Sequence, residues 1–249
     1  EGNKKMLEKL KSIVGENNVR ENESMAGHST FRAGGECKYF IEVSDTKVLK
    51  ELISCLNAEK KQYMIIGNGS NILVKDSGYD GIVIHLSGEE FNDVTMEEMS
   101  DKRLKVTAGS AAMLGAMCKK AGKSGYTGTE GLAGIPGTIG GAVVMNAGAY
   151  GQEIKDIISE CICMKKNGET VTLSKEELDL SYRHSIICEE ELIVLKAVFI
   201  LEKGDLEKIE AKMKECAQLR KEKQPLEYPS AGSTFKRPQG YFAGKLIMD

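Results

Sequence analysis

The spacing of apolar residues predicts that the first third of the chain alternates between helices and strands. Apolar residues at helical spacing run through residues 6–14, and a second helical pattern over 48–56 follows the potential caps Ser44 and Asp45. Short apolar runs predict strands over 38–43, 63–66 and 81–84. A strand, a helix and a strand in this order predict a parallel β-α-β unit.

The rest of the chain mixes strands with fewer helices. It predicts a helix over 111–121 and strands over 102–108, 161–165, 169–173 and 193–201. The apolar run 192–201 contains Lys196 and is too short to cross a bilayer, so it predicts a buried strand and no membrane role. Asp205 opens a last helix that ends before Pro225, and a third unit therefore begins near Gly204.

Composition and charge narrow the functional classes. The chain of 249 residues has 34 Lys and Arg against 37 Asp and Glu, a net charge of −3 that argues against nucleic-acid binding. Its seven cysteines are scattered and form no paired CxxC motifs, so we expect reduced thiols in a cytoplasmic protein and no zinc site. The N-terminal residues are charged rather than apolar and predict no export signal.

Glycine, at 27 residues or about 11% of the chain, exceeds its usual 7% and marks possible phosphate loops. Residues 67–71 (GNGSN) follow a predicted strand, and their backbone N–H groups could face an anion such as a diphosphate. A tight turn explains this pentapeptide equally well. It is not a dinucleotide-binding fingerprint, because the third glycine would fall at Ile72.

Glycines also recur at every third position from 122 to 140. A Walker A loop is excluded because its first glycine would fall at Met117, and a collagen-like helix is excluded because the run is short and contains only Pro136. We interpret residues 131–141, followed by 145–151, as a long close-packed loop that contacts a large flat ligand.

Two further segments carry side chains suited to catalysis. Arg183 lies in the sequence YRHS, although a surface salt bridge explains an isolated arginine more simply. Ser233 lies in AGSTF without the GxSxG elbow of a hydrolase, and a turn or cap is its simpler role. The three histidines form no HExxH motif, so we expect no metal site.

Taken in order, these segments resemble the UDP-N-acetylenolpyruvoylglucosamine reductase family. The resemblance covers residues 28–249 and rests on five segments: GNGSN at 67–71, GIPGTIGG at 134–141, NAGAYG at 146–151, YRHS at 182–185 and PSAGSTFKRP at 229–238. The short connection between the third and fourth segments resembles that of the family's shorter subtype, which lacks a tyrosine-bearing substrate loop. The implied fold is α+β, an FAD-binding fold of the vanillyl-alcohol-oxidase type with subdomains at 1–86 and 87–203, followed by an α/β substrate domain at 204–249.

The resemblance also implies the ligands. FAD is expected to bind without a covalent bond, and NADPH to serve as the hydride donor in a ping-pong cycle. The implied reaction reduces the enolpyruvyl ether of UDP-N-acetylglucosamine enolpyruvate to UDP-N-acetylmuramate, a peptidoglycan precursor. The residues implied to contact FAD are Gly67, Asn68, Gly69, Ser70, Asn71, Gly131, Gly134, Ile135, Pro136, Gly137, Gly141, Asn146 and Ala147.

By the same resemblance, Arg183 would stabilise the enolate and Ser233 would protonate its α-carbon. Tyr182, Lys223 and Arg237 are expected to contact the substrate, although Lys223 serves equally well as a solvated charge at a helix end. Family members carry a second acid, a glutamate near the C-terminus, that this chain does not reach. We therefore expect a truncated substrate domain and low substrate turnover.

Two other functions remain open at this stage. One is an FAD-dependent sugar or alcohol oxidase of the same fold, and the other is a non-catalytic module that binds a nucleotide sugar. The sequence leaves the oligomeric state open and favours a monomer.

Overall fold

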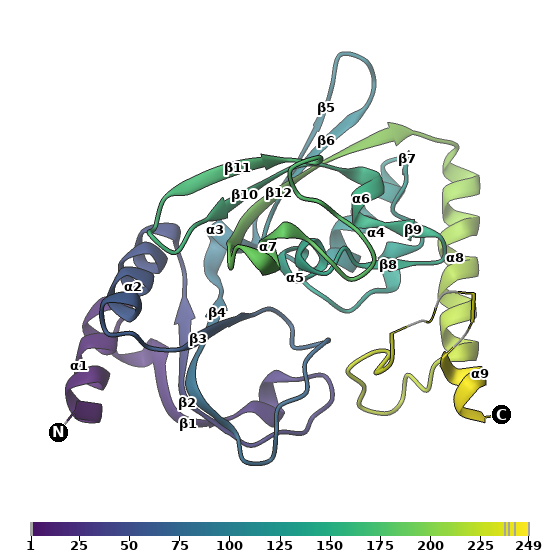
Figure 1. Ribbon diagram of the computed structural model, residues 1–249. Helices are drawn as coiled ribbons and strands as arrows, with labels where there is room; N and C mark the ends of the chain where they lie inside the picture. Colours follow the sequence, from purple (N-terminus) through teal and green to yellow (C-terminus); the bar gives the residue numbers. More distant parts are fainter. Residues whose placement is uncertain (1, 237, 239, 242, 249) are drawn as a thin grey trace.

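The computed structural model describes residues 2–236, 238, 240, 241 and 243–248. Its N-terminal part holds a four-stranded sheet in the order β1-β2-β4-β3 (Figure 1). The strands are Val19–Ser24 (β1), Glu36–Val43 (β2), Tyr63–Ile66 (β3) and Tyr79–Leu86 (β4). β1 runs antiparallel to β2, whereas β2 and β3 both run parallel to β4.

The predicted parallel β-α-β unit is confirmed, with helix α2 (Thr46–Ala58) crossing from β2 to β3. Asp45 is its N-cap, and the carboxylate accepts a hydrogen bond from the backbone N–H of Val48 at 2.8 Å. Helix α1 (Gly2–Val14) packs beside α2 on one face of the sheet (Figure 1). β4 lies between β2 and β3, an order that the apolar pattern did not indicate.

The second part of the chain builds an antiparallel sheet in the order β11-β10-β12-β6-β5. These strands are Val94–Glu98 (β5), Leu104–Gly109 (β6), Ile158–Met164 (β10), Thr170–Ser174 (β11) and Ile193–Lys203 (β12). Two-residue strands are Tyr126–Thr127 (β7), Gly148–Ala149 (β8) and Gln152–Glu153 (β9). β12 lies inside the sheet and its side chains from Ile193 to Val198 are buried except for Lys196, as the apolar run predicted.

Short helices cover this second sheet. They are Gly88–Asn92 (α3), Leu114–Lys123 (α4), Ile139–Val144 (α5), Ile154–Ile157 (α6) and Ile186–Glu189 (α7), with a 3₁₀ turn at Leu132–Gly134 (η3). Two further 3₁₀ turns, Glu16–Asn18 (η1) and Met25–His28 (η2), flank β1 in the N-terminal part. The predicted continuous loop over 131–141 was wrong, because it contains η3 and the first turn of α5. The predicted helix over 111–121 begins three residues later, at Leu114.

Three apolar clusters hold these layers together. One fills the space between the second sheet and its helices, and a second joins α1, α2 and the first sheet to the second sheet through Met164, Ile193 and Leu195. The third, with Phe40 and Val83 at its centre, lies beneath the other face of the first sheet. Because the second cluster contains residues of both sheets, the two sheets share part of their core.

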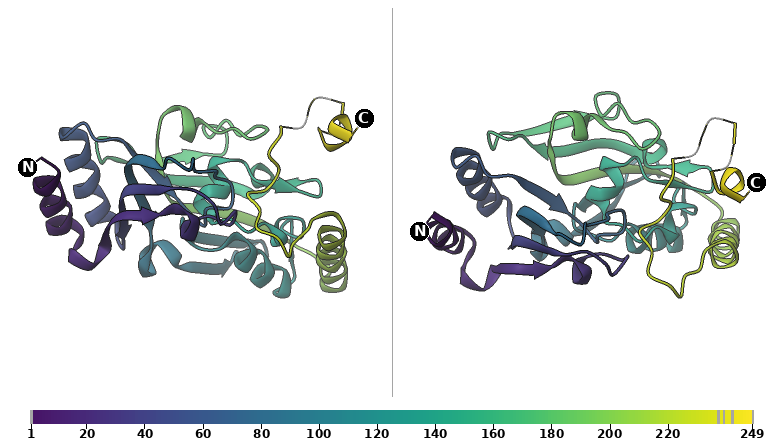
Figure 2. Two further views of the ribbon diagram at one scale, coloured as in Figure 1. Left: turned by 90° about the horizontal axis from the view of Figure 1, so that it is seen from below. Right: turned by 60° about the horizontal axis from the view of Figure 1, so that its bottom comes forward.

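Helix α8 (Leu206–Lys223) begins at Asp205, whose carboxylate accepts from two backbone N–H groups, as predicted. After α8 the chain passes close to the residue 27–32 segment, where Ser230 hydrogen-bonds Thr30, and a short helix α9 (Ala243–Met248) follows near the C-terminus (Figures 1 and 2). Among the helices of the described residues, none has the length and hydropathy that a membrane span requires. All seven cysteines are free thiols and five of them are buried, as composition predicted.

Candidate functional site

The GNGSN segment forms a tight turn between β3 and β4 that packs against residues 27–32. Gly69 adopts φ +62°, and a Cβ added there would collide with the carbonyl oxygen of His28. The backbone N–H of Thr30 donates to the carbonyl of Gly69 at 3.1 Å. Position 69 therefore requires glycine because of a neighbouring backbone, whether or not a phosphate lies nearby.

The two glycine-rich segments meet at this turn. A Cβ on Gly67 would collide with the hydroxyl of Thr138, and the Asn68 side chain donates to the carbonyl of Pro136 at 2.6 Å. Thr138 is the N-cap of α5, and its hydroxyl accepts from the backbone N–H of Gly141. Residues 67–70 and 136–141, far apart in the sequence, thus form one glycine-rich surface.

A pocket of about 360 Å³ opens beside this surface. It is lined by Gly27, His28, Ser29, Thr30, Arg32, Gly67, Asn68 and His85. Most of these residues carry hydroxyl, amide or imidazole groups, and Arg32 has no ion-pair partner within the described part of the chain. The pocket is therefore polar, with one uncompensated positive charge at its edge.

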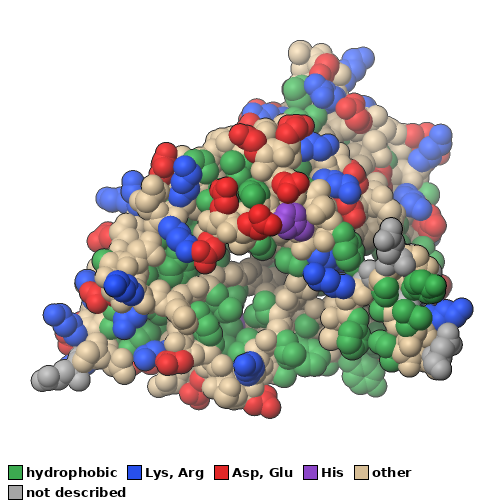
Figure 3. All heavy atoms as spheres, in the orientation of Figure 1, with side chains coloured by type: hydrophobic (Ala, Val, Ile, Leu, Met, Phe, Trp, Pro, Cys, Tyr) green, Lys and Arg blue, Asp and Glu red, His purple; other side chains and the backbone are tan. Residues whose placement is uncertain are grey.

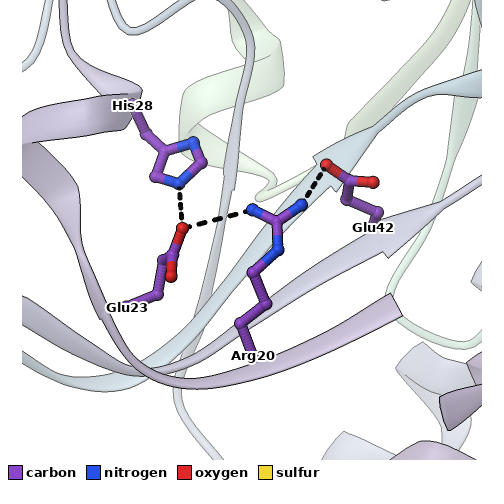
Figure 4. Close-up of polar contacts among 4 residues, drawn as sticks. All are labelled: Arg20, Glu23, His28 and Glu42. Atoms are coloured by element: carbon purple, nitrogen blue, oxygen red, sulfur yellow. Dashed lines mark hydrogen bonds and ion pairs between the residues drawn. The ribbon is translucent and has the colours of Figure 1, made fainter. Parts of the chain in front are cut away.

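A chain of charged contacts fixes one wall of the pocket (Figure 4). The His28 ring lies 2.8 Å from the Glu23 carboxylate, which also contacts Arg20 at 3.2 Å. Arg20 reaches Glu42 on β2 at 2.8 Å, and the His28 ring stacks on Phe40 with 3.9 Å between centroids. Hydrogen bonding from His28, against an opposing effect of burial, lowers the pKa of Glu23. These contacts hold the backbone of His28 against Gly69.

His85, on β4, forms another wall. Its Nδ1 atom is buried and has no hydrogen-bond partner within the described part of the chain. Burial lowers the pKa of His85, and the nearby Glu42 carboxylate opposes that effect. The ring is therefore neutral at pH 7.

A buried carboxylate supports the start of the second glycine segment. Glu130 is 4% exposed and accepts hydrogen bonds from Thr127, the Gly128 backbone and Gln152 at 2.6 to 2.9 Å. Burial alone would raise the pKa of Glu130, but these hydrogen bonds outweigh it and lower the pKa. Gln152 in turn accepts from the backbone N–H of Gly131 at 2.5 Å. This network fixes the backbone at Gly131 without using any ligand.

Packing explains two of the glycines that we attributed to a flat ligand. A Cβ on Gly131 would lie 2.5 Å from the Ala149 carbonyl oxygen. Gly140 faces Ser110 across the α5 contact at 3.0 Å. Close contacts between elements therefore account for Gly131 and Gly140 without a ligand.

Asn146 joins α5 to the turn that carries Arg183. It is 1% exposed, and its side-chain nitrogen donates to Glu153 and to the carbonyl of Ser181, each at 3.0 Å. The hydroxyl of Ser185 donates to the Val144 carbonyl at 2.7 Å. Asn146 thus acts as a structural anchor, a role that the sequence pattern did not distinguish from ligand contact.

Arg183 itself is exposed at the tip of this turn. Its guanidinium lies 5.4 Å from the centroid of the Tyr182 ring, and its backbone adopts φ +57°. The surface salt bridge that sequence reasoning allowed for Arg183 is not found among the described residues. The guanidinium is therefore free to approach an anionic ligand.

The C-terminal segment reaches the same surface. Ser230 makes two hydrogen bonds with Thr30. The Ser230 backbone N–H donates to the Thr30 carbonyl at 3.1 Å, and the Thr30 side-chain hydroxyl donates to the Ser230 carbonyl at 2.6 Å. A Cβ added to Gly232 would lie 3.8 Å from the carbonyl oxygen of Ser70. Ser233, next in the chain, is exposed. The segment thus carries Ser233 to the edge of the glycine-rich surface.

The structure brings some of the expected site residues together and leaves others apart. Residues 67–70, 136–141 and 230–233 converge, whereas Gly134 packs against the Arg220 side chain of α8. Lys223, the last residue of α8, is exposed and makes no ion pair within the described residues. No contact joins Ser233 to Arg183 in the described part of the chain, and Arg237 lies outside the described residues.

Sequence reasoning missed the segment 27–32 and His85, both of which line the pocket. The polar run His28-Ser29-Thr30 before Gly34 and Gly35 was a signal for the first. For His85 the only signal was a polar residue at the end of an apolar strand. Figure 3 shows the face of the molecule that is turned toward the viewer in Figure 1. This face is hollowed between two parts: the one with β10 to β12, and the one with the β3–β4 turn and the C-terminal segment.

Comparisons with known proteins agree on one family. An FAD binding domain model matches residues 37–174. A UDP-N-acetylenolpyruvoylglucosamine reductase of Lachnoclostridium phytofermentans is 45% identical over 99% of this chain and 79% of its own length. The solved structure of the Thermus caldophilus enzyme of that name has a TM-score of 0.77 at 32% identity, covering 92% of this chain and 79% of its own. A vanillyl-alcohol-oxidase-type flavoprotein from Myceliophthora thermophila, at 11% identity and a TM-score of 0.51, covers 68% of this chain and 32% of its own, and shares the fold alone.

Proposed function

Because the chain belongs to the UDP-N-acetylenolpyruvoylglucosamine reductase family, we propose that it holds FAD where residues 67–71 meet residues 134–141. The protein is an oxidoreductase that uses FAD and NADPH to reduce the enolpyruvyl ether of a UDP-sugar to UDP-N-acetylmuramate. Its fold is α+β, with the FAD-binding fold of the vanillyl-alcohol-oxidase type. FAD supplies the redox chemistry, and the protein supplies binding, orientation and proton transfer.

The described residues fit this cofactor. Gly67 and Gly69 leave the turn without side chains, and the neighbouring pocket offers hydroxyl and amide groups together with Arg32, which makes no ion pair with any described residue. His85, which lines the same pocket, makes no side-chain hydrogen bond within the described part of the chain. The convergence of the two glycine segments is the observation that carries the proposal, because a diphosphate needs close backbone approach from more than one side.

Residues at the rim of this surface would act on the substrate. Arg183, with its exposed guanidinium, would stabilise the negative charge that reduction leaves on the α-carbon and its carboxylate. Ser233 would deliver the proton to the α-carbon. Tyr182, Lys223 and Arg237 would contact the substrate. We further propose FAD-binding subdomains at 1–86 and 87–203 and a substrate-binding unit from 204 onward.

We propose a cytoplasmic monomer. The free thiols of all seven cysteines fit a reducing compartment, in which thiols persist without pairing. Size-exclusion chromatography with light scattering tests the monomer, and a mass near twice the 27.2 kDa of the chain would contradict it.

A spectroscopic experiment tests the function. We expect the purified protein, reconstituted with FAD, to bleach when NADPH is added without oxygen and to recover its colour when the enolpyruvyl substrate is added. A protein that takes up no FAD would be a non-catalytic module, and recovery with oxygen after bleaching by an alcohol would indicate an oxidase.

Two histidines line the pocket, so a covalent bond between FAD and a histidine also needs a test. We expect acid denaturation to release all the FAD into the supernatant.

The position of FAD can be tested at Asn71. This residue is exposed in the GNGSN turn, so Asn71→Asp changes one amide to a carboxylate of the same shape with little effect on folding. A negative charge beside a diphosphate is expected to weaken FAD binding by about tenfold or more. Ser100→Asp, at the exposed tip of the β5–β6 hairpin, adds the same charge away from the site. Equal FAD dissociation constants for the two variants, measured by flavin fluorescence, would contradict the placement of FAD at this turn.

A further inference from the structure

His85 has an incomplete set of hydrogen bonds at a position that faces the pocket. The residue lies on β4 beside Ile66, the last residue of β3 before the glycine turn. His85 lines the pocket together with Gly67 and Asn68. On the other side, Glu42 of β2 is its register partner. His85 is thus fixed by two neighbouring strands at the point where the glycine turn begins.

The two ring nitrogens of His85 have different surroundings. Nδ1 is buried without a partner, whereas Nε2 is not among the buried atoms and makes no hydrogen bond within the described residues. A neutral imidazole carries its proton on one nitrogen and accepts through the other. An N–H group buried without an acceptor is costly and rare in proteins, whereas a bare ring nitrogen in apolar surroundings loses less. The environment therefore favours the form with the proton on Nε2.

Protonation of both nitrogens is disfavoured by the same environment. The imidazolium would place an unpaired N–H at the buried Nδ1 position, and burial lowers the pKa of His85. The titratable groups that act on the ring are Glu42 on β2, Arg20 on β1, and His28. Glu42 and Arg20 are paired with each other, and His28 is paired with Glu23. None of these groups is hydrogen-bonded to His85. The ring therefore presents one neutral N–H donor to the pocket.

We propose that His85 donates its Nε2 proton to a phosphate oxygen of the FAD diphosphate. The proposal rests on the placement of FAD given above. An anionic oxygen is the acceptor that a lone neutral donor beside a glycine-rich turn matches best. The contact would join the strand β4 to the cofactor directly, in addition to the backbone groups of the turn.

Substitutions at position 85 distinguish a hydrogen bond donated from the Nε2 position from one donated from the Nδ1 position. Glutamine places an amide nitrogen near the Nε2 position, whereas asparagine places it near the Nδ1 position and leucine provides no donor. We expect His85→Gln to bind FAD within about threefold of the parent, and His85→Asn and His85→Leu to bind it tenfold or more weakly. Thermal unfolding of each apoprotein shows whether folding is retained. Equal weakening by all three folded variants would overturn the proposal.

A measurement on the unaltered protein gives an independent test. The chain has only three histidines, so the imidazole ¹⁵N resonances can be assigned with His28→Gln and His184→Gln variants. We expect His85 to show the Nε2-protonated form in the apoprotein at pH 7.5, and its Nε2 resonance to shift when FAD is added. An Nδ1-protonated form, or an Nε2 resonance unmoved at saturating FAD, would overturn the proposal. A protein that binds no FAD would instead contradict the proposed function.

Discussion

Replacing Ser233 by alanine is expected to slow reduction of the enolpyruvyl substrate by about 10²- to 10⁴-fold, the usual cost of losing a positioned proton donor. The residue is exposed and follows Gly232, whose backbone approaches Ser70 at the edge of the glycine-rich surface. The substitution should leave the bleaching of the flavin by NADPH at its parental rate, because that half-reaction needs no proton on the α-carbon. Anaerobic stopped-flow spectroscopy measures each half-reaction separately.

The neighbouring residue provides a matched control. Thr234 is also exposed, so Thr234→Val removes a hydroxyl from the same segment without affecting a proposed proton donor. We expect this variant to keep both half-reaction rates within about twofold of the parent, since surface substitutions are usually close to neutral. If Ser233→Ala leaves the substrate half-reaction unchanged, Ser233 has no part in the chemistry and serves as a turn residue. Equal slowing in both variants would point to a disordered segment instead.

Arg183→Gln should slow the same half-reaction by about 10²- to 10³-fold, because the enolate loses a cationic partner in the transition state. The side chain is exposed and makes no ion pair within 4 Å in the described part of the chain, so its replacement affects only the contact with the Tyr182 ring and a longer-range attraction to Glu153. Glutamine retains hydrogen-bonding capacity without the charge. The flavin should still bleach with NADPH, and FAD affinity should not change.

Arg103→Gln is the control for the loss of a positive charge. Arg103 pairs with Asp101 at the tip of the β5–β6 hairpin, which projects from the second sheet (Figure 1). We expect parental rates in both half-reactions for this variant. Identical rates for Arg183→Gln and the parent would show that the enolate is stabilised by other groups. A loss of FAD from Arg183→Gln would assign this residue to the cofactor instead of the substrate.

The sequence by itself predicted most of the regular structure of this protein. Asp205 was predicted to open its helix, and Ser44 and Asp45 were the two candidate caps of the earlier helix, of which the structure shows Asp45. A short polar side chain directly before a helix accepts hydrogen bonds from the free N–H groups of the first turn. The strand over 193–201 was recognised from its continuous apolar run, and the parallel unit from the order of its elements. Each of these features depends on neighbours close in the sequence, which is why a single chain reveals it.

Only the tertiary structure decided what the glycines do and which polar side chains share a surface. Gly69 meets the carbonyl of His28, and Gly67 meets Thr138, a residue 71 positions away. The sequence marked Gly67 and Gly69 as close-contact positions but did not identify the partner in either contact. The pocket residues His28 and His85 come from separate elements, and the buried Nδ1 of His85 follows from the packing of β4 between β2 and β3. Spacing along a chain reports local conformation, whereas burial and hydrogen-bond satisfaction depend on which distant segments fold against it.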